Sequence, residues 1–262
     1  MIALYHFHGS TCSQKVRLVL AEKEIDYESR DVDLLSGAQH DPEYIELNPN
    51  HVVPTLVHDR GVFIESTLIN EYLDDAFPDV PLRPDDAAGC HAMRLWTQRI
   101  DALHPNAGVL TFSIGTRPMM LQRSPEEIEA QLEQIPDPRN RERRRAVFEK
   151  GIEAPIFADA MRAFVGVLDR MQADLSMRKW LAGDRFTLAD AAALPYVMRL
   201  DHLAMTPLLS ARPMLADWYQ RVQARPSFET AVSSVLPQMI IDMFRKNGEA
   251  VWSDVRSIAL EA

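Results

Sequence analysis

The pattern of hydrophobic and polar residues divides the chain into two parts. Over residues 1–78, short apolar runs typical of strands alternate with apolar positions at helical spacing. The order strand, helix, strand, helix, strand, strand, helix predicts a mixed sheet covered by helices. The strands are expected at residues 2–7, 27–32, 48–58 after a turn, and 62–64, and the helices around residues 16–21, 42–47 and 65–73.

The segment 77–84 contains three prolines in seven residues, which is typical of a linker. The pattern beyond it is helical nearly throughout, without strand-like alternation. We therefore expect a small α/β domain, residues 1–78, and a larger all-α domain, residues 86–262. Its helices are predicted at residues 86–110, 125–134, 139–173, 187–200, 213–224 and 227–235, followed by an apolar tail, residues 239–252, that packs back over a substrate pocket or forms a dimer contact.

Composition narrows the possible partners. The 262 residues include 38 acidic and 28 basic side chains, a net charge of −10, which argues against a nucleic-acid or anionic-membrane binder. The two cysteines are too few for a disulfide scaffold and fit a reducing compartment. Since no apolar run reaches membrane-spanning length and the start lacks the pattern of a signal peptide, we expect a cytoplasmic protein.

Three short motifs could carry chemistry. At residues 10–13, Ser-Thr-Cys-Ser opens the first helix, where backbone N–H groups, the helix dipole and a hydroxyl could together lower a thiol pKa. Val53-Pro54, if cis, would turn its backbone outward to pair with an extended peptide. At Glu65-Ser66, helix amides and a hydroxyl could hold a carboxylate. Each motif alone is also compatible with an ordinary helix cap or a structural proline.

Taken together and in this order, these motifs resemble the cytosolic glutathione transferase family over nearly the whole chain. The resemblance extends into the second half, where Thr187 and Asp190 have the spacing of a capping box with a structural role. The segments that carry it are residues 10–23, 48–49, 53–56, 65–73, 180–184 and 187–190.

The resemblance implies a thioredoxin-like first domain, an all-helical second domain and a homodimer with a detoxification role. It implies glutathione as co-substrate and a cis peptide bond before Pro54, with the backbone of Val53 binding the cysteinyl part. Glu65 and Ser66 would hold the γ-glutamyl end, and His40, with Gln39, would lie near the glycyl carboxylate. No metal site is expected.

Three side chains compete for the role of thiol activator. Ser10 occupies the position of the activating serine in serine-type classes, and its motif is similar to that of the maleylacetoacetate isomerase class. Ser13 is second, by similarity to bacterial β-etherases, and Cys12, which could form mixed disulfides, is third. The local cationic groups would be His40, Lys15 and Arg17, unless these side chains are simply solvated surface.

The electrophile is expected to be hydrophobic and aromatic. An acidic run followed by arginines within residues 124–155 resembles β-aryl-etherase-type members, which favours bulky aromatic substrates. The alternatives are β-aryl ether cleavage, glutathione-dependent isomerisation, thiol oxidoreduction, or a non-enzymatic glutathione-binding module. The residues expected to line the electrophile pocket are Trp96, Leu103, His104, Asn106, Val109 and Phe112.

Overall fold

The computed structural model describes residues 1–260, with the backbone alone for Leu260. These residues form two compact units. The first unit comprises Met1–Gln98, Arg178–Pro195 and Trp218–Leu236. The second comprises Arg99–Met177, Tyr196–Asp217 and the described residues from Pro237 onward.

The first unit contains a four-stranded mixed sheet with the strand order β2-β1-β3-β4. Strand β1 runs parallel to β2 and antiparallel to β3, which in turn pairs antiparallel with β4. The expected thioredoxin-like α/β arrangement is thus confirmed. In chain order its elements are β1 (Ile2–His6), α1 (Thr11–Glu22), β2 (Glu28–Asp31), the 3-10 turn η1 (Ala38–His40), α2 (Pro42–Leu47), β3 (Thr55–His58), β4 (Gly61–Phe63) and α3 (Ser66–Ala76).

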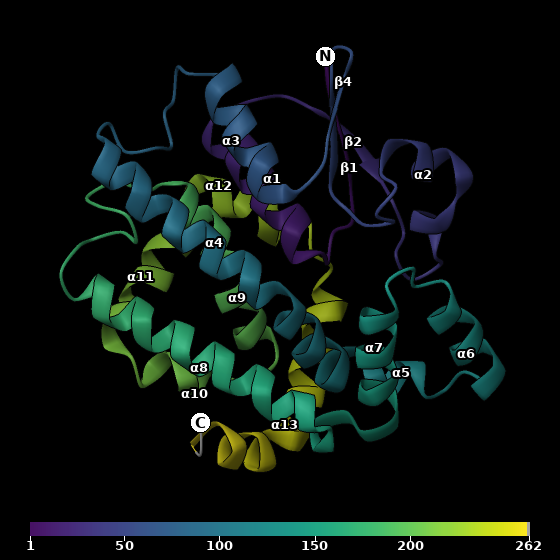
Figure 1. Cartoon of the computed structure of the whole chain (residues 1–262). Helices are drawn as coiled ribbons and strands as arrows, with labels where there is room; N and C mark the ends of the chain where they lie inside the picture. The colour runs from purple at the N-terminus through teal and green to yellow at the C-terminus, as the bar shows by residue number, and fades with distance from the viewer. Residues whose placement is uncertain (261–262) are drawn as a thin grey trace. The chain divides into compact units, whose positions relative to one another are not determined.

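Helices cover both faces of this sheet. Helices α1 and α3 pack against each other on one side of it, and α2 lies on the other (Figure 1). The α1 and α3 side bears fully buried aliphatic side chains such as Leu18 and Ile69. On the α2 side, Tyr44 packs with Phe7 and Val53. Burial of apolar residues from both faces holds β1 and β3 in place, and the ends of these strands carry the candidate site.

The remaining described elements are helical, as expected for the second half of the chain. They are α4 (Ala87–Leu110), the π-helical turn η2 (Thr111–Thr116), α5 (Arg117–Met120), α6 (Pro125–Glu133), α7 (Pro138–Lys150), the 3-10 turn η3 (Gly151–Glu153), α8 (Pro155–Leu175), α9 (Leu188–His202), α10 (Thr206–Ser210), α11 (Pro213–Gln223), α12 (Pro226–Phe228), the π-helical turn η4 (Glu229–Ser233) and α13 (Gln238–Leu260).

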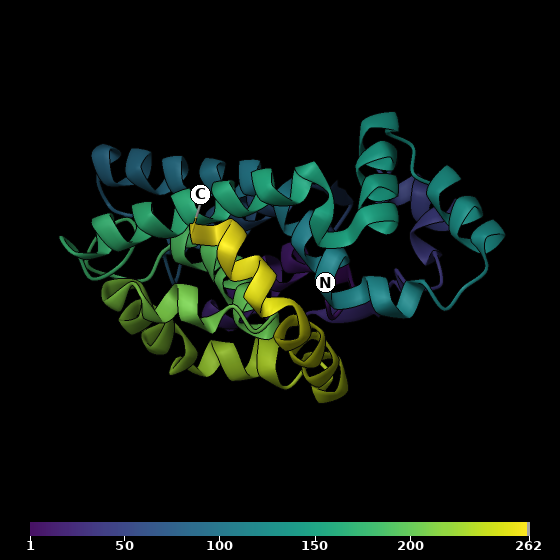
Figure 2. The same ribbon diagram turned by 90° about the horizontal axis from the view of Figure 1, so that it is seen from below.

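The prediction of a single helix over residues 139–173 is wrong. This segment forms two helices, α7 and α8. Gly151 ends the first helix with a φ of +57°, and Pro155 is the first residue of the second. The helix predicted over residues 227–235 is a single α-helical turn followed by the π-helical turn η4. The apolar tail is a helix, α13, which packs against α8 and η2 within the second unit (Figure 2). Among residues 1–260, no helix combines the length and apolarity needed to cross a membrane.

Candidate functional site

The first candidate element is the N-terminus of α1. Ser10 is the N-cap, with extended backbone, and its Oγ accepts a hydrogen bond from the Ser13 N–H at 3.2 Å. Ser10 and Cys12 both keep part of their surface accessible, whereas Thr11 and Ser13 are buried. Two of the three competing side chains therefore border solvent at the positive end of the helix.

Ser13 faces inward. It is fully buried, and its Oγ accepts a hydrogen bond from the Phe7 N–H at 3.4 Å, just after β1. A hydroxyl enclosed in this way supports the strand-to-helix turn and is not presented to solvent. Between the two serines, the structure leaves Ser10 as the more accessible hydroxyl.

Arg17 anchors the turn that carries Ser10. It is 1% exposed, and it donates to the carbonyl oxygens of Phe7 at 3.3 Å, His8 at 3.1 Å and Ala231 at 2.8 Å. Burial lowers the pKa of Arg17 to about 10, so the guanidinium remains charged at neutral pH. The interpretation of Arg17 as solvated surface is wrong, because these carbonyl groups replace water.

Lys15 is also buried, so the interpretation of Lys15 as solvated surface is wrong as well. Its Nζ donates to Thr67 Oγ1 at 2.6 Å, and Asn70 Nδ2 donates to the Lys15 carbonyl at 3.4 Å. Thr67 and Asn70 belong to the first turns of α3. A buried ammonium group therefore lies beside the N-terminus of α3, where it adds to the positive end of that helix dipole.

The start of α3 carries the second motif. Glu65 is exposed and has a φ of +67°, a conformation that non-glycine residues rarely adopt, whereas Ser66 is buried. Asn50 Nδ2 donates to Glu65 Oε1 at 3.5 Å. Such strained residues cluster at ligand-binding positions, and this one turns a carboxylate outward ahead of the helix amides.

The backbone before β3 forms the third motif. The Val53-Pro54 peptide bond is cis, as the family resemblance implies. The carbonyl oxygen of Val52 accepts hydrogen bonds from Tyr44 Oη at 2.6 Å and Asn48 Nδ2 at 2.9 Å. Buried side chains therefore fix the path of the chain into Val53.

Gln39 and His40 belong to a chain of polar groups. Gln39 Nε2 lies 3.0 Å from His40 Nε2, and His40 Nδ1 lies 3.0 Å from His51 Nδ1. Since the amide donates to Nε2, a neutral His40 donates from Nδ1 to His51. Burial, and then His51, lower the pKa of His40, which favours that neutral form. His51 was not predicted as a site residue, because no motif in the sequence indicates that it contacts His40.

The residues expected to line the electrophile pocket have different environments. Trp96, Leu103 and Val109 are enclosed by protein and belong to the core. In the second unit, His104 is exposed and its Nδ1 lies 3.0 Å from Tyr196 Oη, while Asn106 and Phe112 are partly exposed.

A side chain that the sequence reasoning did not single out lies against Phe112. The guanidinium carbon of Arg144, on α7, is 3.0 Å from the centroid of the Phe112 ring. Arg144 was visible in the sequence only as one of several arginines on a helix, so no pattern distinguished it.

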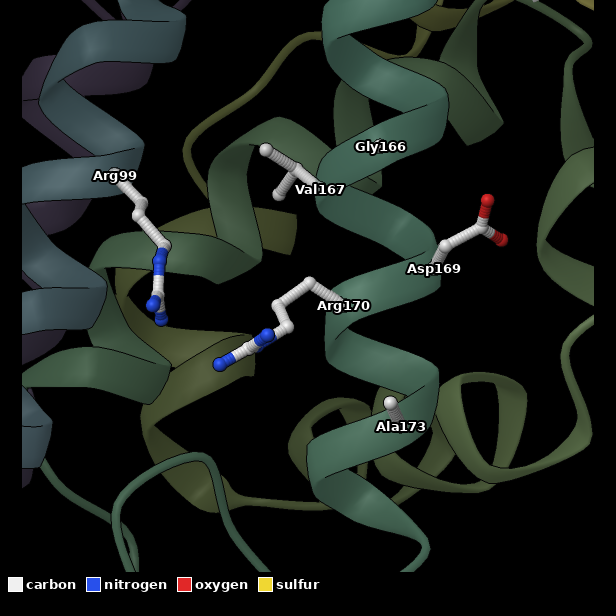
Figure 3. Close-up of a pocket in the computed structure, with 6 residues that line it drawn as sticks. All are labelled: Arg99, Gly166, Val167, Asp169, Arg170 and Ala173. Carbon is white, nitrogen blue, oxygen red and sulfur yellow. The ribbon is translucent and has the colours of Figure 1, made fainter.

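An open groove of about 470 Å³ lies on the second unit (Figure 3). Arg99 projects into it from α4, and the other lining residues belong to α8; none of them is an expected site residue. Among the described residues, no group of three His, Cys, Asp or Glu side chains is placed to hold a metal ion. The lining residues are Arg99, Gly166, Val167, Asp169, Arg170 and Ala173.

Family models match both halves of the chain. The N-terminal domain of glutathione S-transferases matches residues 4–81, and the C-terminal domain of the same family matches residues 119–226. The chain is 33% identical to glutathione S-transferase 3 of Zea mays, covering 89% of this chain and 94% of that protein.

Two bacterial proteins are also similar. The tetrachloro-p-hydroquinone reductive dehalogenase of Sphingobium chlorophenolicum is 30% identical, with 88% of this chain and 95% of that protein covered. The crystal structure of the β-etherase LigF from a Sphingobium strain superposes with a TM-score of 0.80 at 27% identity, covering 88% of this chain and 98% of that chain.

Proposed function

Because the chain belongs to the glutathione S-transferase family, it is a glutathione transferase with glutathione as co-substrate, and we propose that it acts on a hydrophobic aromatic electrophile. The observation that carries the proposed site is the accessible Ser10 at the start of α1, above a turn anchored by the buried Arg17.

The binding residues follow from the three motifs. Glu65 and Ser66 hold the γ-glutamyl end, with the buried Lys15 adding positive charge beside the helix. The backbone of Val53 pairs with the cysteinyl part, and Pro54 shapes that segment. Gln39 and His40 lie near the glycyl carboxylate. These polar groups fit an anionic tripeptide because helix N-termini and N–H donors recognise carboxylates.

The chain's part in the chemistry is to stabilise negative charge. The Ser10 hydroxyl and the N-terminal amides of α1 donate to the thiolate, which lowers the thiol pKa and keeps the sulfur ionised at neutral pH. Bound glutathione supplies the nucleophile: a C–S bond forms, the leaving group departs with its bonding electrons, and the thiol proton passes to solvent. In this scheme Ser13 holds the turn and Cys12 is dispensable.

Cleavage of β-aryl ethers is the second candidate, favoured by the similarity to the β-etherase LigF. The same thiolate would attack the ether, and a phenolate would be the leaving group, where a halide leaves from a halogenated electrophile. The two activities therefore differ in the electrophile and not in the activated sulfur. His104, Asn106 and Phe112 are the accessible residues that we assign to the electrophile, whereas Trp96 and Leu103 are buried.

We also propose a cytoplasmic homodimer whose domains are residues 1–78 and 86–262. Light scattering on the purified protein tests the assembly, because a homodimer has twice the 29.7 kDa mass of the chain. A single species at the monomer mass would contradict it.

The activity is tested with the wild-type protein and two electrophiles. We expect glutathione-dependent conjugation of 1-chloro-2,4-dinitrobenzene, and a β-aryl ether that releases a chromogenic phenol tests the second candidate. Conjugation without release of the phenol would support the transferase activity and exclude β-aryl ether cleavage. Isothermal titration without glutathione binding at millimolar concentration would overturn the site, and glutathione binding without turnover of either electrophile would favour the non-enzymatic glutathione-binding module.

A further inference from the structure

His51 lies beside the two residues proposed for the glycyl end of glutathione, although no sequence motif marks it. Gln39 Nε2 lies 3.0 Å from His40 Nε2, and His40 Nδ1 lies 3.0 Å from His51 Nδ1. All three residues are partly exposed, and all belong to the first unit. This chain of polar groups therefore ends at His51, in a residue that remains in contact with solvent.

The backbone of His51 is held in an uncommon conformation. Its φ of +55° lies in the left-handed region, which histidine adopts more readily than most non-glycine residues. The His51 N–H donates to the Asn48 carbonyl at 3.0 Å, and Asn48 Nδ2 donates to the Val52 carbonyl at 2.9 Å. The buried Asn48 therefore fixes the place of His51, two residues before Val53.

The direction of the hydrogen bonds follows from the Gln39 amide. A neutral histidine has one N–H donor and one acceptor nitrogen. Because Gln39 donates to Nε2 of His40, the proton of His40 is on Nδ1, which donates to Nδ1 of His51. The proton of a neutral His51 is therefore on Nε2, and among residues 1–260 this nitrogen has no hydrogen-bond partner. Since both ring nitrogens of His40 are occupied, the N–H left for a ligand belongs to His51.

The turn that carries His51 also contacts the other end of the proposed glutathione site. Asn50 Nδ2, one residue before His51, donates to Glu65 Oε1 at 3.5 Å. At the glycyl end, the ring centroids of His40 and His51 are 5.2 Å apart, so a ligand group near one ring is also near the other. One short segment therefore touches both ends of the site.

An anionic ligand favours the hydrogen-bond direction described. Rotation of the Gln39 amide by 180° would reverse the chain and leave an acceptor lone pair on Nε2 of His51, which repels a carboxylate. Burial, and then His51, lower the pKa of His40. A neutral His40 relays the direction of the hydrogen bonds to His51 without carrying charge itself.

We propose that His51 is a further glutathione-binding residue, whose Nε2–H donates to the glycyl carboxylate. His40 and Gln39 are positioning residues at this end, because they fix the tautomer of His51. The inference rests on the proposed glutathione site and names the donor at its glycyl end.

Calorimetric titration with glutathione and with its glycinamide analogue tests this role, because the analogue has a neutral amide in place of the glycyl carboxylate. We expect the wild type to prefer glutathione by about tenfold, since hydrogen bonds to a charged acceptor are stronger. His51→Asn places its amide near the position of Nδ1 and should lose most of that preference. His51→Gln places its amide nitrogen near the position of Nε2 and should retain most of it.

The turn should survive in His51→Asn, because asparagine also tolerates a positive φ. The control is His91→Asn, which changes an exposed histidine on α4 and should leave both affinities unchanged. A preference that persists in His51→Asn, or one that is lost in His51→Gln, would overturn the inference.

The wild type alone separates this inference from the proposed function. Equal affinity for both ligands would refute the role of His51 and leave the glutathione site intact. If neither ligand binds at millimolar concentration, the proposed site itself fails, and the role of His51 fails with it.

Discussion

Ser10 and Ser13 lie one helical turn apart, yet they have opposite environments. Ser13 is buried and accepts a hydrogen bond from the Phe7 N–H, whereas Ser10 caps the helix and remains partly exposed. The sequence motif could not separate them, because either serine could cap or activate. The distinction depends on how β1 packs behind the turn, which is a tertiary property.

The first prediction concerns Ser10. Ser10→Ala should lower kcat/KM for conjugation by about 10- to 100-fold, since one donor to the thiolate is lost. The same change removes a helix cap and costs about 1 kcal/mol of stability. Steady-state rates at saturating and limiting glutathione measure the activity, and urea unfolding measures the stability.

Ser124→Ala is the matched control for that cap, because Ser124 is the N-cap of α6 and its Oγ accepts from the Glu127 N–H at 3.2 Å. It should cost similar stability without loss of activity. Cys12→Ala should change conjugation by less than about threefold, since a thiol is not required. A Cys12→Ala variant that is inactive while Ser10→Ala retains full rate would favour the thiol oxidoreductase and contradict our assignment.

At the scale of elements, the sequence predicted the order and type of the strands and α-helices in the first 76 residues, whereas the 3-10 turn η1 was expected to be a loop. It failed where α-helical periodicity hid a change in geometry. The π-helical turn η4 lies inside the span that was predicted as one helix, residues 227–235. Gly151 and Pro155 mark the break between α7 and α8, whereas the prediction of one helix followed the helical spacing across them.

The candidate site was predictable only where its residues form local sequence motifs. Glu65-Ser66 and Val53-Pro54 are local motifs, and their places at the starts of α3 and β3 follow from the chain order. The burial of Lys15 and Arg17 could not be foreseen, because charged residues on a helix are usually solvated. Their partners, Thr67 and Ala231, are distant in sequence.

The close packing of α13 yields the second prediction. A Cβ added at Gly248 would lie 2.0 Å from the carbonyl oxygen of Leu203. Gly248→Ala should therefore destabilise the protein by about 1–3 kcal/mol, since the helix must move away. The midpoint of urea unfolding, followed by circular dichroism, measures the change.

Gly166→Ala is the matched control, because a Cβ at Gly166 on α8 would meet nothing within 4 Å. It should stabilise the protein by about 0.5–1 kcal/mol through helix propensity alone. If the two alanine variants shift the midpoint in the same direction by similar amounts, the contact between α13 and Leu203 is not as close as described.

At the scale of the whole molecule, buried neutral histidines couple stability to pH. Burial, and then Arg17 and His8, lower the pKa of His6 to about 4. His6 Nδ1 accepts from Arg17 Nη1 at 3.1 Å. Protonation of His6 would place an N–H donor at Nδ1 facing the N–H donor of Arg17, and the hydrogen bond would be lost. Burial, and then Arg199, likewise lower the pKa of His202 to about 4. The two histidines lie in different units, so both units are affected.

The third prediction follows from the sign of these shifts. Between the folded pKa and the unfolded value of about 6.5, the unfolded chain binds more protons, so stability falls as pH decreases. Each histidine should cost about 2 kcal/mol at pH 5 relative to neutral pH. Urea unfolding at pH 7.5 and 5.0 measures this, and His6→Gln should have a shallower dependence than the wild type. The exposed His91→Gln is the control, and a wild-type midpoint that does not change with pH would refute the coupling.

The net charge of −10 gives the molecule no general attraction for anionic glutathione. Binding must rest on local groups, namely the N-termini of α1 and α3 and the buried cations Lys15 and Arg17. These groups converge on one task, which is to hold an anionic peptide and keep its sulfur ionised.

Titration of the thiol of bound glutathione is the most direct test of this account. The ultraviolet absorbance of the thiolate, measured against pH with excess enzyme and with S-methylglutathione as the blank, reports the thiol pKa. We predict a value of about 7 or below, against about 8.5 for a free thiol, and a return toward the free value in Ser10→Ala. A thiol that binds the wild-type enzyme with its ordinary pKa would contradict the central claim.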